Sequence, residues 1–220
     1  MQIQYLLSLL SLVVASAASP LPSADIPSDQ NTPKCPNYCD HTAYNASLVH
    51  TYVCGDSRLG PRRLPKGITL GDLVNTYDRF GGLCPGQFLA KWYDSLTGSW
   101  IYPPQAGFQL NSGGAPIEGT ITLPANFMLD RFGSEYGTYT SPQGAPYMQR
   151  ALPPSNLDTP QSSPVYPYNY HVYKVLVPFE VVAGPIAGWF GQPGQGVQYQ
   201  MSSNIMSLIA DGFIERVPLK

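Results

Sequence analysis

The sequence predicts an α+β fold, in which a small antiparallel β-core follows a disulfide-containing, partly helical N-terminal module. Three observations lead to this prediction. The chain has 23 Pro, 21 Gly and 15 Tyr but only 12% charged residues, a composition typical of short strands joined by many turns. Segments of alternating apolar and polar residues gather in the second half. All four cysteines lie before residue 85, in the first half.

The first 18 residues predict a secretory signal peptide. An apolar run that begins at Tyr5 is followed by Ala15, Ala17 and Ala18, the small residues expected at a cleavage site. The run is too short to span a bilayer, and no later stretch approaches about 20 consecutive apolar residues, so we expect no membrane span. Residues 19–34 are rich in Pro and Ser without apolar periodicity, which predicts a flexible leader.

A cysteine-bearing module is expected at residues 35–115. In an exported chain an even number of cysteines predicts disulfides, here two bridges with three possible connectivities. A zinc site is the alternative, but export and the lack of a paired C-x-x-C spacing disfavour it. The four residues concerned are Cys35, Cys39, Cys54 and Cys84. The tripeptide Asn45-Ala46-Ser47 predicts N-glycosylation of Asn45 on a surface loop.

One helix is expected in this module, after Thr69. Thr69 is the predicted N-cap, and Gly81-Gly82 are predicted to end the helix. An apolar stripe is formed by Leu70, Leu73, Val74 and Tyr77. The module is expected to be structural. Residues 103–119 (PPQAGFQLNSGGAPIEG) contain turn formers and few apolar anchors, so we place a module boundary there and expect the second module at 116–220.

The second module is expected to consist mainly of short strands. Alternation predicts strands at 119–123, 170–177, 180–183 and 213–217. A short helix is expected between the last two, with Ser202 or Ser203 as its cap and Gly212 at its end. Its predicted apolar face consists of Ile205, Met206, Leu208 and Ile209.

Several function classes are disfavoured by the sequence. The net charge is −2 and neither half has a basic excess, so nucleic acid is not an expected partner. The chain has no G-x-S-x-G elbow, H-E-x-x-H motif or P-loop. Its three histidines, His41, His50 and His171, are too scattered to predict a metal cage, and His171 in a strand is expected to be a packed residue.

Four polar segments stand out because no core would require them. They are DRFGSEYG at 130–137, Ser141-Pro142, RALPP at 150–154 and GWFGQPGQGVQY at 188–199. Each alone has an ordinary explanation, such as an Arg131 ion pair with Asp130 or Glu135, or a hairpin at the glycines. In this order they resemble the TNT domain, named for the tuberculosis necrotizing toxin, over about residues 119–217. With a signal peptide and a cysteine-bearing module, the chain resembles the secreted NADases displayed on fungal spores.

The resemblance implies hydrolysis of the nicotinamide–ribose bond of NAD, and the choice between NAD and NADP stays open. Nicotinamide leaves as a neutral amine because its ring nitrogen is already cationic, so a site poor in carboxylates suffices, unlike most glycosidase sites. The resemblance also implies a catalytic glutamine in the last segment. Gln198 is our choice because it would begin a strand that points into the cleft, and Gln192 and Gln195 stay open. Arg131 and Arg150 suit the diphosphate, which guanidinium groups bind bidentately.

Further substrate contacts are expected from Phe132, Tyr136, Trp189, Phe190 and Gln192. ADP-ribosyl transfer or cyclisation is an alternative on the same substrate, but residues 184–201 contain no glutamate to activate an acceptor. A non-enzymatic adhesin or coat protein is the other alternative. The resemblance is to secreted relatives that form homodimers, and some of them bind calcium as a structural ion. Here Asp211 and Glu215 near the end of the sequence form no dense acidic loop, so calcium stays open but is not expected. No cofactor is required.

Overall fold

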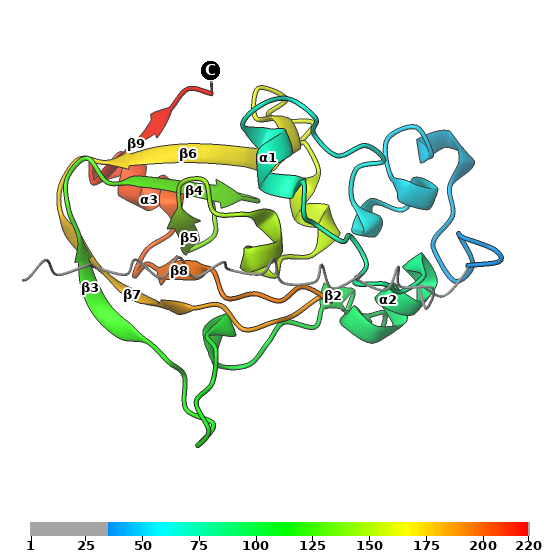
Figure 1. Cartoon of the computed structure of the whole chain (residues 1–220). Helices are drawn as coiled ribbons and strands as arrows, with labels where there is room; N and C mark the ends of the chain where they lie inside the picture. The colour runs from blue at the N-terminus through cyan, green and yellow to red at the C-terminus, as the bar shows by residue number, and fades with distance from the viewer. Residues whose placement is uncertain (1–34, 220) are drawn as a thin grey trace, which may run out of the picture. The chain divides into compact units, whose positions relative to one another are not determined.

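The computed structural model describes residues 35–219 (Figure 1). The signal peptide predicted at 1–18 and the leader predicted at 19–34 therefore lie outside the described residues. The described residues fall within one compact unit. Its first half consists mainly of turns, short helices and a two-stranded hairpin, and its second half forms a large β-sheet.

Within residues 35–219, seven strands form one sheet in which every neighbouring pair is antiparallel. The order across the sheet is β3-β7-β8-β5-β4-β6-β9. The strands are β3 Gly119–Leu123, β4 Met128–Phe132, β5 Tyr139–Pro142, β6 Tyr170–Val175, β7 Phe179–Pro185, β8 Val197–Gln200 and β9 Ile214–Val217. The predicted α+β class with an antiparallel core is confirmed. Of the predicted strands, 119–123 agrees at both ends with β3.

The sheet curves around helix α3, Ile205–Ala210, which lies between β6 and β8 in Figure 1. Ile205 and Leu208 of the helix are buried in one cluster with Leu123 of β3 and Ile214 of β9, the two edge strands. Side chains from opposite edges can share one cluster only if the sheet bends toward the helix. Burial of this apolar face is the main force that holds the sheet in its curved form.

The cap predicted for α3 is wrong, because Asn204 and not Ser202 or Ser203 precedes the helix. The Asn204 side chain accepts a hydrogen bond from Ser207 N at 2.9 Å, as N-cap residues do. The predicted end at Gly212 is confirmed, since Gly212 follows the helix with a φ of 75°. Met206 is 37% exposed, so it does not belong to the buried face of the helix.

The first half contains helices α1, Leu70–Val74, and α2, Pro85–Trp92, followed by the hairpin of β1, Tyr93–Asp94, and β2, Ser99–Trp100. The predicted helix after Thr69 exists, but it ends at Val74 and not at Gly81-Gly82, and the Thr69 side chain makes no capping hydrogen bond. Helix α2 was not predicted. Its N-terminus is stabilised by the Gln87 side chain, which accepts a hydrogen bond from Cys84 N at 3.1 Å.

The two halves share hydrophobic clusters. The predicted apolar stripe is buried, since Leu73 and Val74 of α1, and Tyr77 beyond its end, pack in one cluster with Phe132 of β4 and Tyr170 of β6. A separate cluster joins residues of the first half to the turn before β8; it contains Leu59, Phe80, Phe88, Leu89 and Phe190. That residues 35–115 and 116–220 are separate domains stays a prediction.

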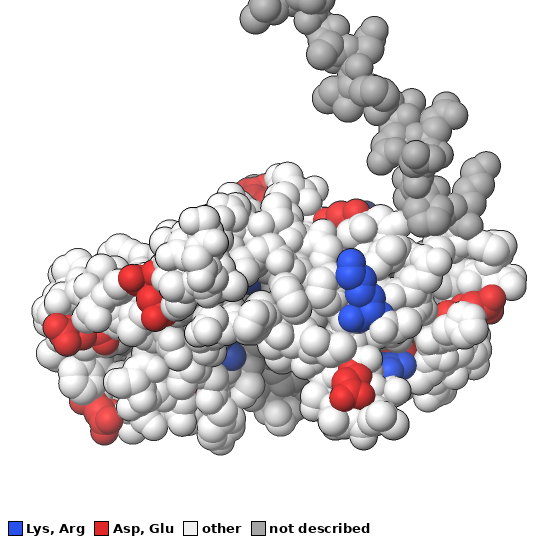
Figure 2. Space-filling view, turned by 90° about the horizontal axis from the view of Figure 1, so that it is seen from below, with Lys and Arg blue, Asp and Glu red and all other residues white. Residues whose placement is uncertain are grey.

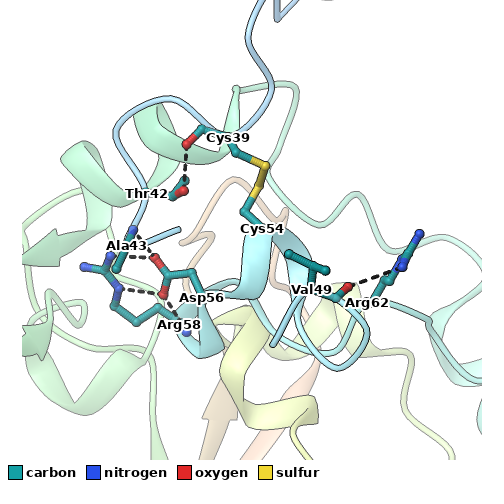
Figure 3. The surroundings of a disulfide bond; sticks show 8 residues. All are labelled: Cys39, Thr42, Ala43, Val49, Cys54, Asp56, Arg58 and Arg62. Carbon is teal, nitrogen blue, oxygen red and sulfur yellow. Dashed lines mark hydrogen bonds and ion pairs between the residues drawn. A yellow bond between two sulfur atoms is a disulfide. The ribbon is translucent and has the colours of Figure 1, made fainter. Parts of the chain in front are cut away.

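The two predicted disulfides are present, and the structure gives their pairing as Cys35–Cys84 and Cys39–Cys54. All four thiols are consumed, which excludes the zinc alternative at these residues. Figure 3 shows the second bridge beside Asp56, whose carboxylate accepts a hydrogen bond from Ala43 N at 2.9 Å and pairs with Arg58. The bridge and the ion pair together stabilise residues 39–58, a segment with few buried apolar side chains.

Removal of the Cys39–Cys54 bridge is expected to lower the free energy of unfolding by about 3 kcal/mol. The bridge closes a loop of 15 residues, and a loop of that size loses about this much chain entropy in the unfolded state. Urea unfolding of the Cys39→Ala/Cys54→Ala double variant measures the loss. Unfolding of the wild-type protein in the presence of a reductant is the comparison. A urea midpoint of the double variant equal to that of the oxidised wild type would contradict the prediction.

Asp158 is a half-buried carboxyl that we expect to destabilise the fold at neutral pH. Its Oδ1 atom is buried without a hydrogen-bond partner, and burial raises its pKa from 3.8 to about 8, against the weaker opposing effect of Arg79. The folded state therefore binds a proton that the unfolded chain releases above pH 4. This contribution to stability is complete below pH 4 and is lost progressively up to pH 8.

The Asp158→Asn variant should accordingly be more stable than the wild type at pH 8, by at least about 1 kcal/mol, the equivalent of one pKa unit. The gain should disappear at pH 4, and thermal unfolding at pH 4, 6 and 8 tests this dependence. Glu118→Gln, which removes an exposed carboxyl, is the charge-matched control. A loss of stability at pH 8 would show that Asp158 is an ionised partner of Arg79.

Candidate active site

A cavity of about 370 Å³ opens between the sheet and a loop from the first half of the chain. This volume lies in the range of small-molecule sites. Arg131 of β4, Gln198 of β8 and Arg150 line it, and Tyr102 and Ala106 contribute its other wall. A smaller hollow of about 40 Å³ shares both arginines and Gln198 and extends the site toward β5. Three residues that were predicted to act together are therefore brought together.

Arg131 is held by backbone carbonyls. Its Nε donates to Ser134 O at 2.7 Å, and its Nη1 donates to Tyr139 O at 2.5 Å. The guanidinium lies across Gly137, where a Cβ would be 2.0 Å from Nη2, so a side chain at this position would displace the guanidinium. Burial lowers the pKa of Arg131, but an arginine stays charged at any working pH. The ion pairs considered for Arg131, with Asp130 or Glu135, do not form.

Arg150 ends a short 3-10 helix, Tyr147–Arg150, and is almost completely buried. Its Nη1 lies 2.6 Å from Oδ1 of Asp130, and its Nε and Nη2 donate to Ala145 O. Asp130 is fully buried, and its other oxygen accepts from Gly144 N and from the Tyr170 hydroxyl. The charge of Arg150 is thus matched inside the protein, whereas Arg131 has no acidic partner among the described residues.

Gln198 is the second residue of β8, and its side chain is buried at the cavity wall. Its Nε2 donates to Ala106 O at 2.9 Å. The start of β8 lies close to the helix that carries Arg150 because Gly196 N donates to Gln149 O at 3.0 Å. A Cβ on Gly196 would be 2.7 Å from that carbonyl, so this close approach requires glycine.

The other candidate glutamines lie outside the cavity lining. Gln192 is buried, and its Nε2 donates to Asp78 O in the first half of the chain. Gln195 is exposed in the turn before β8 and has a φ of 71°. The structure therefore brings Gln198, and neither Gln192 nor Gln195, to the two arginines.

The predicted aromatic contacts divide into three groups. Phe132 lines the smaller hollow, where its ring centroid lies 5.1 Å from the guanidinium carbon of Arg150. Tyr136 is 77% exposed and does not line the cavity. Trp189 and Phe190 pack in the cluster shared with the first half, and Trp189 Nε1 donates to Ile101 O. Phe190 supports the cavity indirectly, because it packs against Tyr102 with ring centroids 5.7 Å apart.

His171 is packed, as predicted. It is buried between Tyr166 and Tyr173, and its Nε2 lies 3.0 Å from Asn169 Oδ1. Burial lowers its pKa, which keeps the imidazole neutral. The neighbouring Glu135 has its pKa lowered by hydrogen bonds from Arg216 and Tyr173 that outweigh the opposing effect of burial.

Sequence reasoning missed three parts of the site. One is Asp130, the buried partner of Arg150; its place before Arg131 in an otherwise apolar strand was the available signal. Another is the wall formed by Tyr102, Ala106 and Gly107, from a segment whose composition marks a break between modules. Asn156, whose Nδ2 donates to Phe132 O at 3.1 Å, also lines the cavity and was not predicted.

Among residues 35–219 no group of three or more His, Cys, Asp or Glu side chains is placed to hold a metal ion, and we assign no residue to calcium. The helices described are too short or too polar to cross a bilayer. Figure 2 shows one face on which acidic and basic side chains are sparse and scattered, without a broad patch of one sign.

The chain is similar to several known proteins. A family model described as tuberculosis necrotizing toxin matches residues 122–217. The conidial surface nicotinamide adenine dinucleotide glycohydrolase nadA of Aspergillus fumigatus is 53% identical over 169 residues, 76% of this chain and 71% of that protein. Among solved structures, tuberculosis necrotizing toxin complexed with its immunity factor IFT aligns with a TM-score of 0.45 and 19% identity, covering 81% of this chain and 86% of that chain. Tse6 in complex with Tsi6 aligns with a TM-score of 0.33 and 17% identity, covering 46% of this chain and 72% of that chain.

Proposed function

Because the chain belongs to the family of TNT-domain NAD glycohydrolases, we propose that its cavity binds NAD and that Arg131, Arg150 and Gln198 act in the reaction. The chain is an enzyme that cleaves NAD to ADP-ribose and nicotinamide. The observation that supports this use of the cavity is the convergence of two guanidinium groups and one amide from separate parts of the chain.

The chemistry of the reaction fits these side chains. Water attacks the anomeric carbon of the nicotinamide ribose, the bond from that carbon to the ring nitrogen breaks, and its electron pair neutralises the positive charge on the ring. Nicotinamide leaves without protonation, and the attacking water releases its proton. The protein therefore needs to orient the ribose and the water, which an amide does without a change of protonation. It must also exclude bulk water, which the walls at Tyr102 and Ile186 favour.

The two arginines differ in what they offer an anion. Arg150 is compensated by Asp130 at 2.6 Å, so its net attraction for a diphosphate is reduced. Arg131 donates hydrogen bonds only to neutral carbonyls, and Glu135 acts on its charge only from beyond ion-pair distance. We therefore assign the main attraction for the NAD diphosphate to Arg131, and to Arg150 a shorter-range contact whose direction is fixed by Asp130.

Incubation of the purified protein with NAD tests the proposed function. We expect nicotinamide and ADP-ribose to be released in equal amounts, as measured by chromatography. A cyclic product, or ADP-ribose attached to protein, would instead support the transferase or cyclase alternative. The described cavity lining contains no glutamate, which favours water as the acceptor. If no nicotinamide is released, the remaining alternative is a non-enzymatic surface protein.

Parallel reactions with NADP measure the preference between the two dinucleotides as a ratio of kcat/KM values.

Substitution of Arg131 by Ala is expected to reduce kcat/KM by about 10- to 100-fold, mostly through weaker NAD binding. Charge-assisted hydrogen bonds of this kind contribute about 1.5–3 kcal/mol, and about 1.4 kcal/mol corresponds to a factor of ten. Arg131→Lys, which keeps the charge but loses the planar fork, should fall between wild type and Arg131→Ala. Arg62→Ala, which removes an exposed arginine outside the cavity lining, is the control. Unchanged KM and kcat in Arg131→Ala would remove this residue from the site.

We also propose that the protein is secreted and displayed at a cell or spore surface. The relative nadA is a conidial surface protein, and two disulfides are suited to an oxidising compartment. Asn45 is exposed, and its Oδ1 accepts hydrogen bonds from Ser47 N and Oγ, which leaves its amide nitrogen toward solvent for a glycan.

Expression in a eukaryotic host tests secretion, and N-terminal sequencing of the secreted product tests the cleavage near residue 18. A mass shift on glycosidase treatment that is absent from Ser47→Ala would identify the glycan.

Homodimerisation is a further proposal, which rests on the resemblance to secreted relatives. Sedimentation velocity of the purified protein tests it, and a single species with the mass of one processed chain at micromolar concentration would contradict it.

A further inference from the structure

A strained loop from the first half of the chain forms one wall of the cavity. Residues 103–107 (PPQAG) begin with two prolines, and the last three residues, Gln105, Ala106 and Gly107, have φ values of 50°, 55° and 82°. Consecutive left-handed residues that are not glycine are costly, and they persist only where the surroundings hold them. Here Ala187 N donates to Gly107 O at 2.9 Å, and Phe108 forms a bridge with Ile186, so the loop is fixed to the end of β7.

The strained conformation directs the carbonyl of Ala106 toward Gln198. Gln198 Nε2 donates to that carbonyl at 2.9 Å. A backbone carbonyl can only accept a hydrogen bond, so the amide nitrogen of Gln198 must face it. The amide oxygen, Oε1, has no hydrogen-bond donor among residues 35–219. Because Gln198 lines the cavity, this oxygen is the atom left to receive a substrate hydroxyl or a water.

We propose that residues 103–107 are a positioning element that sets the orientation of the Gln198 amide, so that Oε1 faces the substrate as a hydrogen-bond acceptor. The amide then holds the donor group of a ribose hydroxyl or of the attacking water. The role of the first half of the chain is thus to fix the direction of the reacting amide. This inference rests on the proposed NAD cleavage.

The Gln198→Glu variant tests the orientation through its pH profile. The ionised carboxylate has no hydrogen to donate to Ala106 O, so the side chain is repelled from its position and kcat is lost. Protonation restores one donor and one acceptor in nearly the same geometry. The ratio of its kcat to that of the wild type should therefore rise as the pH falls, by up to about tenfold per pH unit above the pKa of the introduced carboxyl. The wild-type amide does not titrate and provides the reference.

A matched pair of glycine variants tests the loop itself. Gly107 has a φ of 82°, and Gly114, at an exposed turn with open space around it, has a φ of 80°. Alanine imposes similar backbone strain at both positions, but only Gly107 lies against the Gln198 amide, whose Oε1 would be 3.8 Å from the new Cβ. Gly107→Ala should lower kcat at least about tenfold with KM within about twofold, whereas Gly114→Ala should leave both unchanged. In a Gln198→Ala background, Gly107→Ala should cause no further loss of kcat.

The outcomes separate the two levels of the proposal. If the wild-type protein releases no nicotinamide, the proposed function fails. If the wild type is active and Gln198→Glu has high kcat at all pH values, or Gly107→Ala and Gly114→Ala have equal kcat, the positioning role of residues 103–107 is wrong while the proposed function stands.

Discussion

Replacement of Gln198 by alanine is expected to lower kcat for NAD cleavage by on the order of 100-fold or more, while the affinity for NAD changes only a few-fold. Effects of this size follow when a group that orients the reactants is lost, since small displacements of reacting atoms carry large kinetic costs. The arginines remain in place, because their hydrogen bonds are to Ser134, Tyr139 and Ala145 and none involves Gln198. Single-turnover kinetics, together with NAD titration of the inactive variant, separates binding from chemistry.

Gln195→Ala is the matched control, because Gln195 is exposed in the same turn and should be replaceable without loss of kcat. Gln192→Ala should instead lower stability, since it removes the hydrogen bond to Asp78 O. If Gln192→Ala abolishes turnover in a folded protein and Gln198→Ala does not, the choice of Gln198 as the catalytic glutamine is wrong, although the chain still belongs to the same family.

Replacement of Asp130 by asparagine is expected to cause the largest loss of stability, about 3 to 5 kcal/mol. The change is nearly isosteric, but it leaves the guanidinium of Arg150 buried without a counter-charge. The side chains of Arg150 and Asp130 are 3% and 0% exposed, so neither can reach water without local unfolding. Urea unfolding measures the effect, and activity at a temperature where the variant is folded should also fall, because Arg150 lines the cavity.

Asp56→Asn provides the comparison for this variant. Asp56 is also buried, but its partner Arg58 is 26% exposed and can turn toward solvent, so a smaller loss is expected. An Asp130→Asn/Arg150→Met double variant should recover part of the stability without recovering activity. Equal losses for Asp56→Asn and Asp130→Asn would mean that burial of the pair does not govern its energetic importance.

The sequence predicted the parts of the sheet whose alternation is undisturbed. Strands at 119–123, 170–177, 180–183 and 213–217 correspond to β3, β6, β7 and β9 with shifts of two residues or fewer at each end. Strands β4 and β5 were missed, and β8 was expected only as a strand beginning at Gln198, because polar side chains replace apolar ones at positions facing inward. Examples are Asp130, Ser141 and Gln198, all buried. The strands that build the site are thus the ones that an apolar pattern hides.

Errors in the helices have local causes. The helix after Thr69 was predicted to reach Gly81-Gly82, but it stops at Val74, and Tyr77 then packs edge-on against Tyr147 at 4.6 Å. This tertiary contact overrides the helical pattern. Helix α2 begins with Pro85 and Gly86, which read as breakers in the sequence, although proline is favoured in the first turn of a helix.

The polar side chains of the site could be predicted from sequence motifs, but the cavity wall opposite them could not. Arg131, Arg150 and Gln198 each lie two or three residues from a glycine or proline, in segments whose composition marks them as unusual. The contribution of residues 102–107 depends on contacts between segments about 90 residues apart, such as Ala106 with Gln198. Nothing in a local pattern encodes such a pairing, and only the folded chain reveals it.

Residues 102–107 lie before residue 122, where the match to the toxin family begins. The cavity of this chain is therefore completed by a segment outside the motif by which its family is recognised. Substitutions at residues 102–107 can alter the shape of the cavity and its choice of ligand while the matched motif stays unchanged.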